Sequence, residues 1–123
     1  MTEEFLHYLW RFRLFQPELT TVSGENLTVI HPGDYNRDGG PDFFNARLRI
    51  GKTMWAGNVE IHLKASDWYR HHHEVDHAYN NVILHVVDSF DIDVFDKGSQ
   101  PIPVLEVKGM YSENPFCRYR NLQ

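Results

Sequence analysis

The stretch from His31 to Lys64 constrains the fold of this 123-residue chain more than any other part of the sequence. An acidic, glycine-rich loop leads into Pro41-Asp42, and two strand-like runs follow at residues 43–50 and 54–64. Gly51-Lys52 separates the runs, and two such runs joined by a short turn indicate an antiparallel hairpin. We therefore expect this hairpin at the centre of a sheet, with the rest of the chain as scaffold around it.

Four side chains of this stretch are the candidate catalytic residues. Alternate side chains of a strand share a face, so Glu60, His62 and Lys64 project together from the second run. Asp42, at the start of the first run, comes close to them if the two runs pair. An Asp and a Glu beside a His or Lys bind a hard divalent cation and activate water. The structural alternative is that Asp42 only begins a strand and that Glu60 and Lys64 form a solvated row.

The segments before this hairpin predict a helix and a second, smaller hairpin. Thr2 is a candidate N-cap for a helix over residues 3–15, whose apolar side chains recur at helical spacing until Pro17 ends it. Residues 19–30 hold two β-branched runs around a glycine-containing turn, which indicates a short hairpin. In the strand at residues 43–50, alternation predicts one face made of Phe44, Ala46, Leu48 and Ile50.

The segments after it predict a further helix and a buried strand. Ser66-Asp67 begins a helix of about ten to fifteen residues, and residues 82–87 (VILHVV) are typical of a strand buried on both faces. Short strands are expected at residues 92–95 and 103–107. This order predicts an α/β (α+β) fold, with a central mixed β-sheet flanked by helices, in a single domain over residues 1–123.

The net charge of −5 and the single cysteine limit the functions and the cellular compartment that we expect for this protein. The negative charge argues against a basic, sequence-independent nucleic-acid binder, because the affinity of such a protein comes from neutralising phosphates. A nuclease is not excluded, because metal ions screen the substrate at an acidic site. Cys117 has no internal disulfide partner, and no leader-like or membrane-length apolar run occurs, so we expect a cytoplasmic protein outside the membrane. Residues 115–119 (PFCRY) indicate that the chain is the N-terminal part of a longer protein.

Pro41-Asp42, the gap of one hairpin and Glu60-Ile61-His62 together resemble the motif of the PD-(D/E)XK nuclease superfamily. The resemblance implies a restriction-endonuclease-like α-β-β-β-α-β core, Asp42 and Glu60 as ligands of Mg²⁺, and a nucleic-acid substrate. His62 stands in the position of the family's lysine, and Lys64 comes one strand repeat later. Three readings stay open: His62 acts as base or ligand, Lys64 reaches in, or the site is inactive.

A rival partner for Asp42 lies further along the chain. Glu106-Val107-Lys108 has the literal E-x-K spacing of the nuclease motif. It follows the predicted helix and buried strand, so it requires an insertion within the core of the fold.

Histidines form a second candidate constellation at His71, His72, His73, His77 and His85. On a continuous helix, His73 and His77 lie four residues apart on one face, a spacing that suits Zn²⁺ or another transition metal. With His62 they define an alternative function, a His-ligated metal hydrolase around Zn²⁺ or Fe²⁺. The structural alternative is a solvated helix face, with His85 as a hydrogen-bonded core histidine.

The loop before Asp42 resembles a calcium loop only in part. Asp34, Asn36 and Asp38 alternate as oxygen ligands do, but the twelfth position of such a loop is Asn45 rather than Glu. We interpret the loop as a turn that places Asp42.

Three longer sequence words, GPDFFNARLRI, WAGNVEIHLKASDW and AYNNVILHVV, resemble an uncharacterised bacterial family, domain of unknown function 2851. The resemblance implies a longer protein and adds no mechanism. The leading hypothesis is a Mg²⁺-dependent nuclease or phosphodiesterase using Asp42, Glu60 and either His62 or Lys64, with Glu4 contributing from the first helix. The alternative from another class is a noncatalytic binding or assembly module on the same fold.

Overall fold

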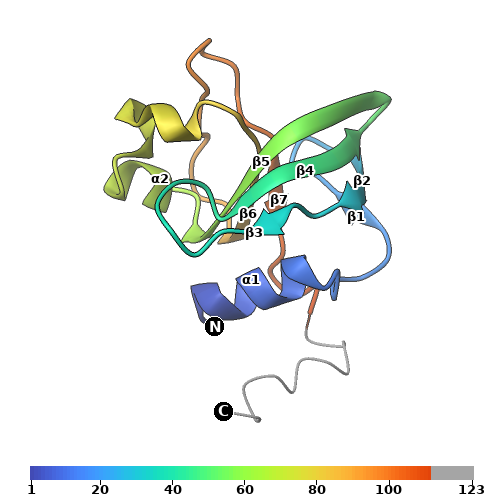
Figure 1. Ribbon diagram of the computed structural model, residues 1–123. Helices are drawn as coiled ribbons and strands as arrows, with labels where there is room; N and C mark the ends of the chain where they lie inside the picture. The colour runs from blue at the N-terminus through green and yellow to red at the C-terminus, as the bar shows by residue number, and fades with distance from the viewer. Residues whose placement is uncertain (112–123) are drawn as a thin grey trace.

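The computed structural model describes residues 1–111; Cys117 and residues 115–119, from which we expect a continuing chain, lie outside the described residues. The fold is mixed α+β, with one mixed sheet and few helices (Figure 1). The elements in chain order are α1 (Glu3–Arg11), β1 (Leu19–Thr20), β2 (Asn26–His31), β3 (Asp34–Tyr35), β4 (Phe43–Ile50), β5 (Thr53–Lys64), α2 (Asp67–Arg70), the 3-10 turns η1 (His73–Val75) and η2 (His77–Tyr79), β6 (Val82–Ser89) and β7 (Val104–Glu106).

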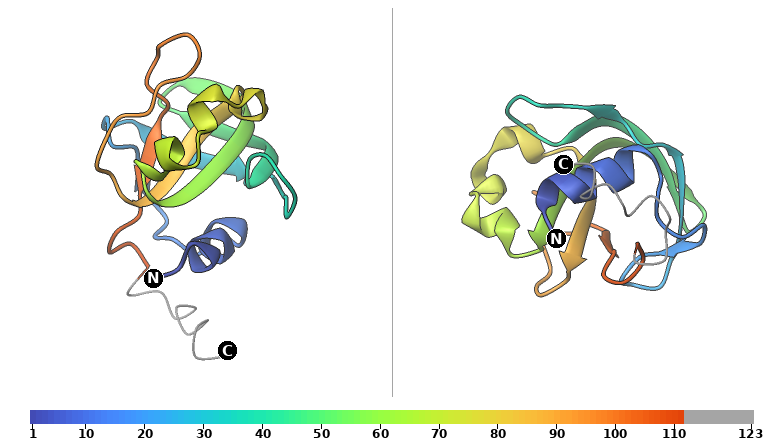
Figure 2. Two further views of the ribbon diagram at one scale, coloured as in Figure 1. Left: turned by 90° about the vertical axis from the view of Figure 1, so that its left-hand side faces the viewer. Right: turned by 90° about the horizontal axis from the view of Figure 1, so that it is seen from below.

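The sheet curls until it is nearly a barrel. Its strand order is β1-β2-β4-β5-β6-β7, and β3 pairs with β4 beside this path. The pairs are antiparallel as far as β5, whereas β5-β6 and β6-β7 are parallel. The N–H of Val22, just beyond β1, donates to the carbonyl of Val104 in β7 at 2.9 Å, so the two edges meet. This contact satisfies edge groups that are otherwise open to pairing with other chains, and α1 lies across one end of the barrel (Figure 2).

Helix α1 begins as predicted and ends earlier. The Thr2 hydroxyl accepts a hydrogen bond from the N–H of Phe5 at 3.1 Å, which confirms the N-cap. The helix ends at Arg11 rather than residue 15, because Arg13 adopts a left-handed φ of 56°. The N–H groups of Arg13 and Leu14 donate to the carbonyls of Trp10 and Leu9, which is a Schellman end.

A bulge in β4 corrects the predicted alternation. The register shifts between Phe43 and Ala46, and Asn45 between them has a positive φ of 60°. The side-chain oxygen of Asn58 in β5 accepts a hydrogen bond from the Asn45 N–H at 3.2 Å and stabilises the bulge. The extra residue puts Phe43, not Phe44, on the buried face with Ala46. The prediction for Phe44 was therefore wrong.

The long helix predicted after Ser66 is also wrong, because the segment breaks into α2 and two 3-10 turns. His72 has a left-handed φ of 59°, which ends helical geometry after Arg70. The Asp76 side chain then accepts a hydrogen bond from the Ala78 N–H at 2.9 Å and begins a new turn. Histidine and aspartate are weak helix formers, and such side-chain caps compete with a continuous helix.

The strands after this segment follow the predictions more closely. β6 is buried on both faces between β5 and β7, as its apolar run predicted. The strand expected at residues 103–107 forms as β7. The strand expected at residues 92–95 is reduced to a single bridge between Phe95 and Pro101.

The two larger apolar clusters that pack on the sheet are an inner core and an outer cluster. The inner core joins α1 to one face of the sheet and includes Phe5, Leu6, Leu9, Trp10, Phe43, Leu48, Val59, Ile61, Leu84 and Val86. The outer cluster lies beneath the segment from α2 to η2 and consists of Trp68, Tyr79, Val82, Val94 and Ile102. No helix among residues 1–111 is long and apolar enough to cross a membrane.

Candidate functional site

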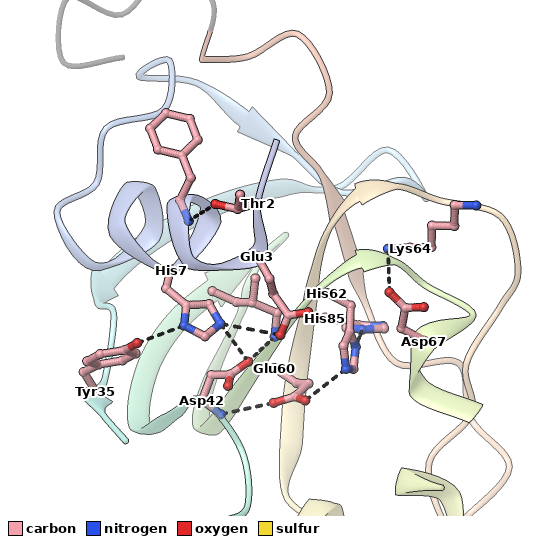
Figure 3. A network of polar contacts seen from close by, with 12 residues as sticks. Thr2, Glu3, His7, Tyr35, Asp42, Glu60, His62, Lys64, Asp67 and His85 are labelled. Carbon is pink, nitrogen blue, oxygen red and sulfur yellow. Dashed lines mark hydrogen bonds and ion pairs between the residues drawn. The ribbon is translucent and has the colours of Figure 1, made fainter. Parts of the chain in front are cut away.

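Asp42 and Glu60 form an acid pair where β4 begins and β5 reaches its middle. The N–H of Asp42 donates to Oε1 of Glu60 at 3.1 Å, and the N–H of Ile61 donates to Oδ2 of Asp42 at 2.9 Å (Figure 3). Pairing of the two strands therefore places the two predicted acids beside each other.

The acid pair holds one proton at neutral pH. Burial alone raises the pKa of Asp42, but contacts with His7 and with the N–H of Ile61 outweigh it and hold this pKa below its usual range. Burial, and next the charge of Asp42, raise the pKa of Glu60 to about 10. Two adjacent carboxylates disfavour each other's charge, so the proton resides on Glu60. A cation placed between them relieves the same repulsion.

Helix α1 contributes two residues to the acid pair that we did not predict. His7 lies with Nε2 at 3.4 Å from Oδ2 of Asp42 and with Nδ1 at 3.1 Å from the Tyr35 hydroxyl. Glu3, one turn earlier, lies 3.9 Å from the same Nε2, and burial followed by the charge of Asp42 raises its pKa. The sequence signal was the i, i+4 spacing of Glu3 and His7. Glu3 thus takes the place expected for Glu4.

His62 lies on the other side of Glu60, as Figure 3 shows. Its Nε2 is 3.2 Å from Oε2 of Glu60, and its Nδ1 is 2.7 Å from Nε2 of His85 in β6. Burial, and then the neighbouring His85, lower the pKa of His62 to about 3, so its ring is neutral. The side chain in the lysine position of the nuclease motif is therefore an uncharged imidazole held in place by a second one.

Two more histidines surround His62. His73 from η1 places Nε2 at 2.9 Å from Oε2 of Glu60 and stacks on Tyr79, with ring centroids 3.7 Å apart. Burial, followed by the charge of His71, lowers the pKa of His73. The ring centroid of His71 lies 5.0 Å from that of His62. A nitrogen-rich group therefore adjoins the acid pair on the face opposite α1.

Lys64 is not brought into this group. Its side chain is exposed at the end of β5 and points away from the acid pair in Figure 3. Its N–H donates to Oδ2 of Asp67 at 3.2 Å and so helps to begin α2. Glu60 and His62, expected in the same polar row, are 4% and 1% exposed. The row thus divides into a buried part and a solvated end.

The structure also separates the rival candidates from Asp42. The Glu106 carboxylate accepts a hydrogen bond from the Phe90 N–H at 2.7 Å and lies on β7, two strands away from β5. His77 lies against Asn80, at 3.2 Å, and is not among the residues around His62. The predicted pair of His73 and His77 on one helical face therefore does not form.

The loop before Asp42 serves as the turn that we interpreted it to be. The amide nitrogen of Asn36 donates to the carbonyls of Asp38, Gly39 and Pro41 at 2.9–3.3 Å. The N–H of Asn36 donates to the carbonyl of Asp42 at 2.8 Å. A single asparagine therefore closes the loop and positions Asp42.

Two groups within residues 1–111 have ligand atoms close enough to hold a metal ion. One is Glu3, His7 and Asp42, and the other is His62, His71 and His73; in each, the ligand atoms lie within 4.8 Å of one another. Glu60 lies between the groups, because it contacts Asp42 through Oε1 and His73 through Oε2. The first group together with Glu60 is rich in oxygen and fits Mg²⁺ or Mn²⁺, whereas the second is rich in nitrogen.

A family model described as "Protein of unknown function (DUF2851)" matches residues 3–123. The match confirms the resemblance that the three sequence words indicated. No curated protein and no solved structure matches the chain. The family description names no activity, so the chemistry of the site rests on its own residues.

Proposed function

We propose that this chain, which belongs to the DUF2851 family of proteins of unknown function, is a nuclease-like hydrolase that uses a divalent cation to cleave phosphodiester bonds in nucleic acid. Asp42 and Glu60 would hold the cation, which we propose is Mg²⁺, and His62 would assist the attacking water. The proposal is carried by one observation: carboxyl groups from two paired strands lie in one largely buried site. Oε1 of Glu60 accepts a hydrogen bond from the N–H of Asp42, and Oδ2 of Asp42 accepts one from the N–H of Ile61.

The arrangement of the elements supports this proposal. The path β2-β4-β5 is antiparallel, β6 is parallel to β5, α1 precedes these strands and α2 connects β5 to β6. This order is compatible with the helix, three-stranded meander, helix and strand that the PD-(D/E)XK resemblance implies, although α2 has only four residues. Asp42 and Glu60 fall at the start of the second meander strand and within the third, where that motif has its acidic residues. The additional strands β1, β3 and β7 extend this core.

Each residue of the site has a role in the proposed reaction. Asp42 and Glu60 would hold a divalent cation, which would supply polarisation of the scissile phosphate and a lowered pKa of a water molecule. The neutral ring of His62 would accept the proton of that water at Nε2, because its Nδ1 is engaged by His85. Unlike a lysine, it supplies no positive charge to the phosphate. We therefore expect the requirement for a cation to be absolute.

His7 acts as a positioning residue for Asp42. It links that carboxylate to the Tyr35 hydroxyl, so α1 and β3 together fix the orientation of the ligand. Metal-binding carboxylates are commonly held by such outer partners. His7→Gln is expected to weaken cation binding while Asp42 itself remains.

The test is cleavage of single-stranded and double-stranded DNA and RNA by the full chain with Mg²⁺ or Mn²⁺. Asp42→Asn and Glu60→Gln are expected to lower the rate at least about 100-fold, since loss of an outer partner alone costs about 10–100-fold. Asp93→Asn, at an exposed carboxylate in the loop after β6, is the matched control and should leave the rate unchanged. Equal rates in all three variants, or no cleavage of any substrate by the unaltered chain, would contradict the proposal and favour a binding module.

A further inference from the structure

Three imidazole rings meet beside Glu60 although their residues lie on three different segments. His62 belongs to β5, His71 follows α2, and His73 begins η1. The ring centroids are 5.0 Å apart for His62 and His71, 5.2 Å for His62 and His73, and 5.5 Å for His71 and His73. We call these three residues the histidine triad. Nearly equal spacings indicate that the rings surround one point.

The backbone at His72 explains how neighbouring histidines face the same way. Its left-handed φ of 59° reverses the chain between His71 and His73. The His72 side chain is 80% exposed as a result, while the rings on either side turn toward His62. A non-glycine residue in this conformation carries a cost in backbone strain. The strained residue here orients the histidine triad.

One nitrogen of the histidine triad is buried and has no hydrogen-bond partner. Nε2 of His62 is buried and has no hydrogen-bond partner among residues 1–111. Oε2 of Glu60 lies 3.2 Å away, but the geometry of this contact is not that of a hydrogen bond. His62 is only 1% exposed. An unpaired buried nitrogen is costly, so such atoms in native proteins commonly mark a bound ion or a catalytic role.

The contacts of His62 and Glu60 suit a metal ligand set. Nδ1 of His62 contacts Nε2 of His85 at 2.7 Å, which leaves Nε2 of His62 as the free lone pair when Nδ1 donates. Ligating histidines usually donate their second nitrogen to such an outer partner. Oε2 of Glu60 faces the triad, at 2.9 Å from His73, while Oε1 faces Asp42. The carboxylate is therefore oriented to bridge two positions.

The donor atoms select the class of ion. Imidazole nitrogen suits Zn²⁺, Co²⁺, Ni²⁺, Cu²⁺ and Fe²⁺, whereas Mg²⁺ prefers oxygen. Nitrogens that share one tetrahedral zinc lie about 3.4 Å apart, given bonds of about 2.0–2.1 Å. The ligand atoms of the triad lie within 4.8 Å, and the exposed His71 can turn to close the remaining gap.

We propose that His62, His71 and His73, with Oε2 of Glu60 as the fourth ligand, form a second cation site that binds a zinc-class transition metal beside the oxygen-rich site of the acid pair. The site goes beyond the proposed hydrolase activity but shares Glu60 and Nε2 of His62 with it, so an ion bound here would take over from His62 the activation of water. Three imidazoles and a carboxylate complete a tetrahedral coordination shell. The bound ion fastens the segment from α2 to η2 onto β5.

The test is titration of the metal-free full chain with Co²⁺ alone, followed by its visible d–d absorption, which is far stronger for tetrahedral than for octahedral coordination. His71→Asn removes an exposed ligand and should leave the fold intact, as circular dichroism can verify. It should weaken Co²⁺ binding at least about tenfold, since a ligand matters no less than an outer partner. His72→Asn and His77→Asn are the matched controls and should bind as the unaltered chain does. Asn also tolerates the left-handed conformation at residue 72.

Asp42→Asn separates this site from the proposed function. It should abolish Mg²⁺-dependent cleavage and leave the tetrahedral Co²⁺ spectrum in place. A tetrahedral spectrum without any nuclease activity supports the second site and contradicts the hydrolase. An octahedral spectrum, equal losses in His71→Asn and His72→Asn, or a loss confined to His77→Asn overturns the second site, whether or not the chain cleaves nucleic acid.

Discussion

In the middle of β5, both faces of the strand are buried, but one face is apolar and the other is polar. Val59 and Ile61 are fully buried in the inner core, against α1 and β6. Glu60 and His62, on the opposite face, are only 4% and 1% exposed. Burial of apolar surface accounts for the first face. The second buries groups that prefer water, so its stability depends on the pairing of their polar atoms.

That pairing is incomplete on the polar face. The buried nitrogens without a hydrogen-bond partner in residues 1–111 are Nε2 of His7, Nε2 of His62, Nε1 of Trp68 and Nδ1 of His85. The three histidines lie around the acid pair, and Trp68 belongs to the outer cluster, where its ring contacts those of His73 and His85. Incomplete pairing confined to one region indicates that this region is shaped by function at a cost in stability.

The largest change in the free energy of unfolding is expected for a substitution on the apolar face of β5. Ile61→Ala removes a fully buried side chain from the inner core and should lower the free energy of unfolding by about 2–5 kcal/mol. Met54→Ala in the same strand, at a side chain 52% exposed, should change it by less than about 0.5 kcal/mol. Urea unfolding measures both. A small loss for Ile61→Ala would mean that the inner core does not hold the sheet together.

Substitution of the adjacent Glu60 should raise the free energy of unfolding rather than lower it. The pKa of Glu60 is raised to about 10 in the folded chain from 4.5, so its contribution to stability is complete below pH 4.5 and decreases as the pH rises toward 10. Glu60→Gln removes this penalty and should stabilise the metal-free chain by about 1–3 kcal/mol at pH 8, with little change near pH 4.5. Unfolding in the presence of a chelator measures it. Destabilisation at pH 8 would show that Glu60 is ionised and well paired.

A substitution at His85 tests how the polar face affects the stability of the fold at acidic pH. Burial, followed by the charge of His73, lowers its pKa to about 3 from 6.5, so the unfolded chain binds the extra proton first and stability decreases as the pH falls from 6.5 toward 3. His85→Gln retains a side-chain amide beside His62 and cannot become charged. It should reduce the loss of stability between pH 6.5 and pH 4.5 by about 1–2 kcal/mol. Unchanged acid sensitivity would place the responsible group elsewhere.

The smallest effect is expected for Lys64. The side chain is exposed and directed away from the acid pair, its charge acts on the exposed Asp91, and its backbone N–H donates to Asp67. Lys64→Ala should change the free energy of unfolding by less than about 0.5 kcal/mol and leave any cleavage rate within a factor of about two. Loss of cleavage comparable to that of Asp42→Asn would return Lys64 to the site in place of His62.

Local patterns predicted the elements whose determinants lie close together in sequence. Thr2 caps α1 as its position indicated, and the apolar run of β6 forms the strand buried between two others. Failures arose where a single residue changed the geometry. Asn45 inserted a bulge and reversed the facing of Phe44, and His72 ended the helix on which His73 and His77 were expected to align. No local pattern reveals that a histidine or asparagine will adopt a left-handed conformation, because contacts elsewhere hold it there.

The sequence by itself predicted that Asp42 comes close to Glu60 if the two strands pair. The bulge in β4, which the sequence did not predict, gives the register in which Asp42 lies beside Glu60 rather than Ile61. The sequence also determined the membership in a family, through words spread over most of the chain. Only the tertiary structure decided that His7 approaches from α1, that His71 replaces His77, and that His62 rather than Lys64 faces the acid pair. These residues come from segments brought together by two separate packing regions, and the packing of α1 and of the segment from α2 to η2 is a global property of the chain.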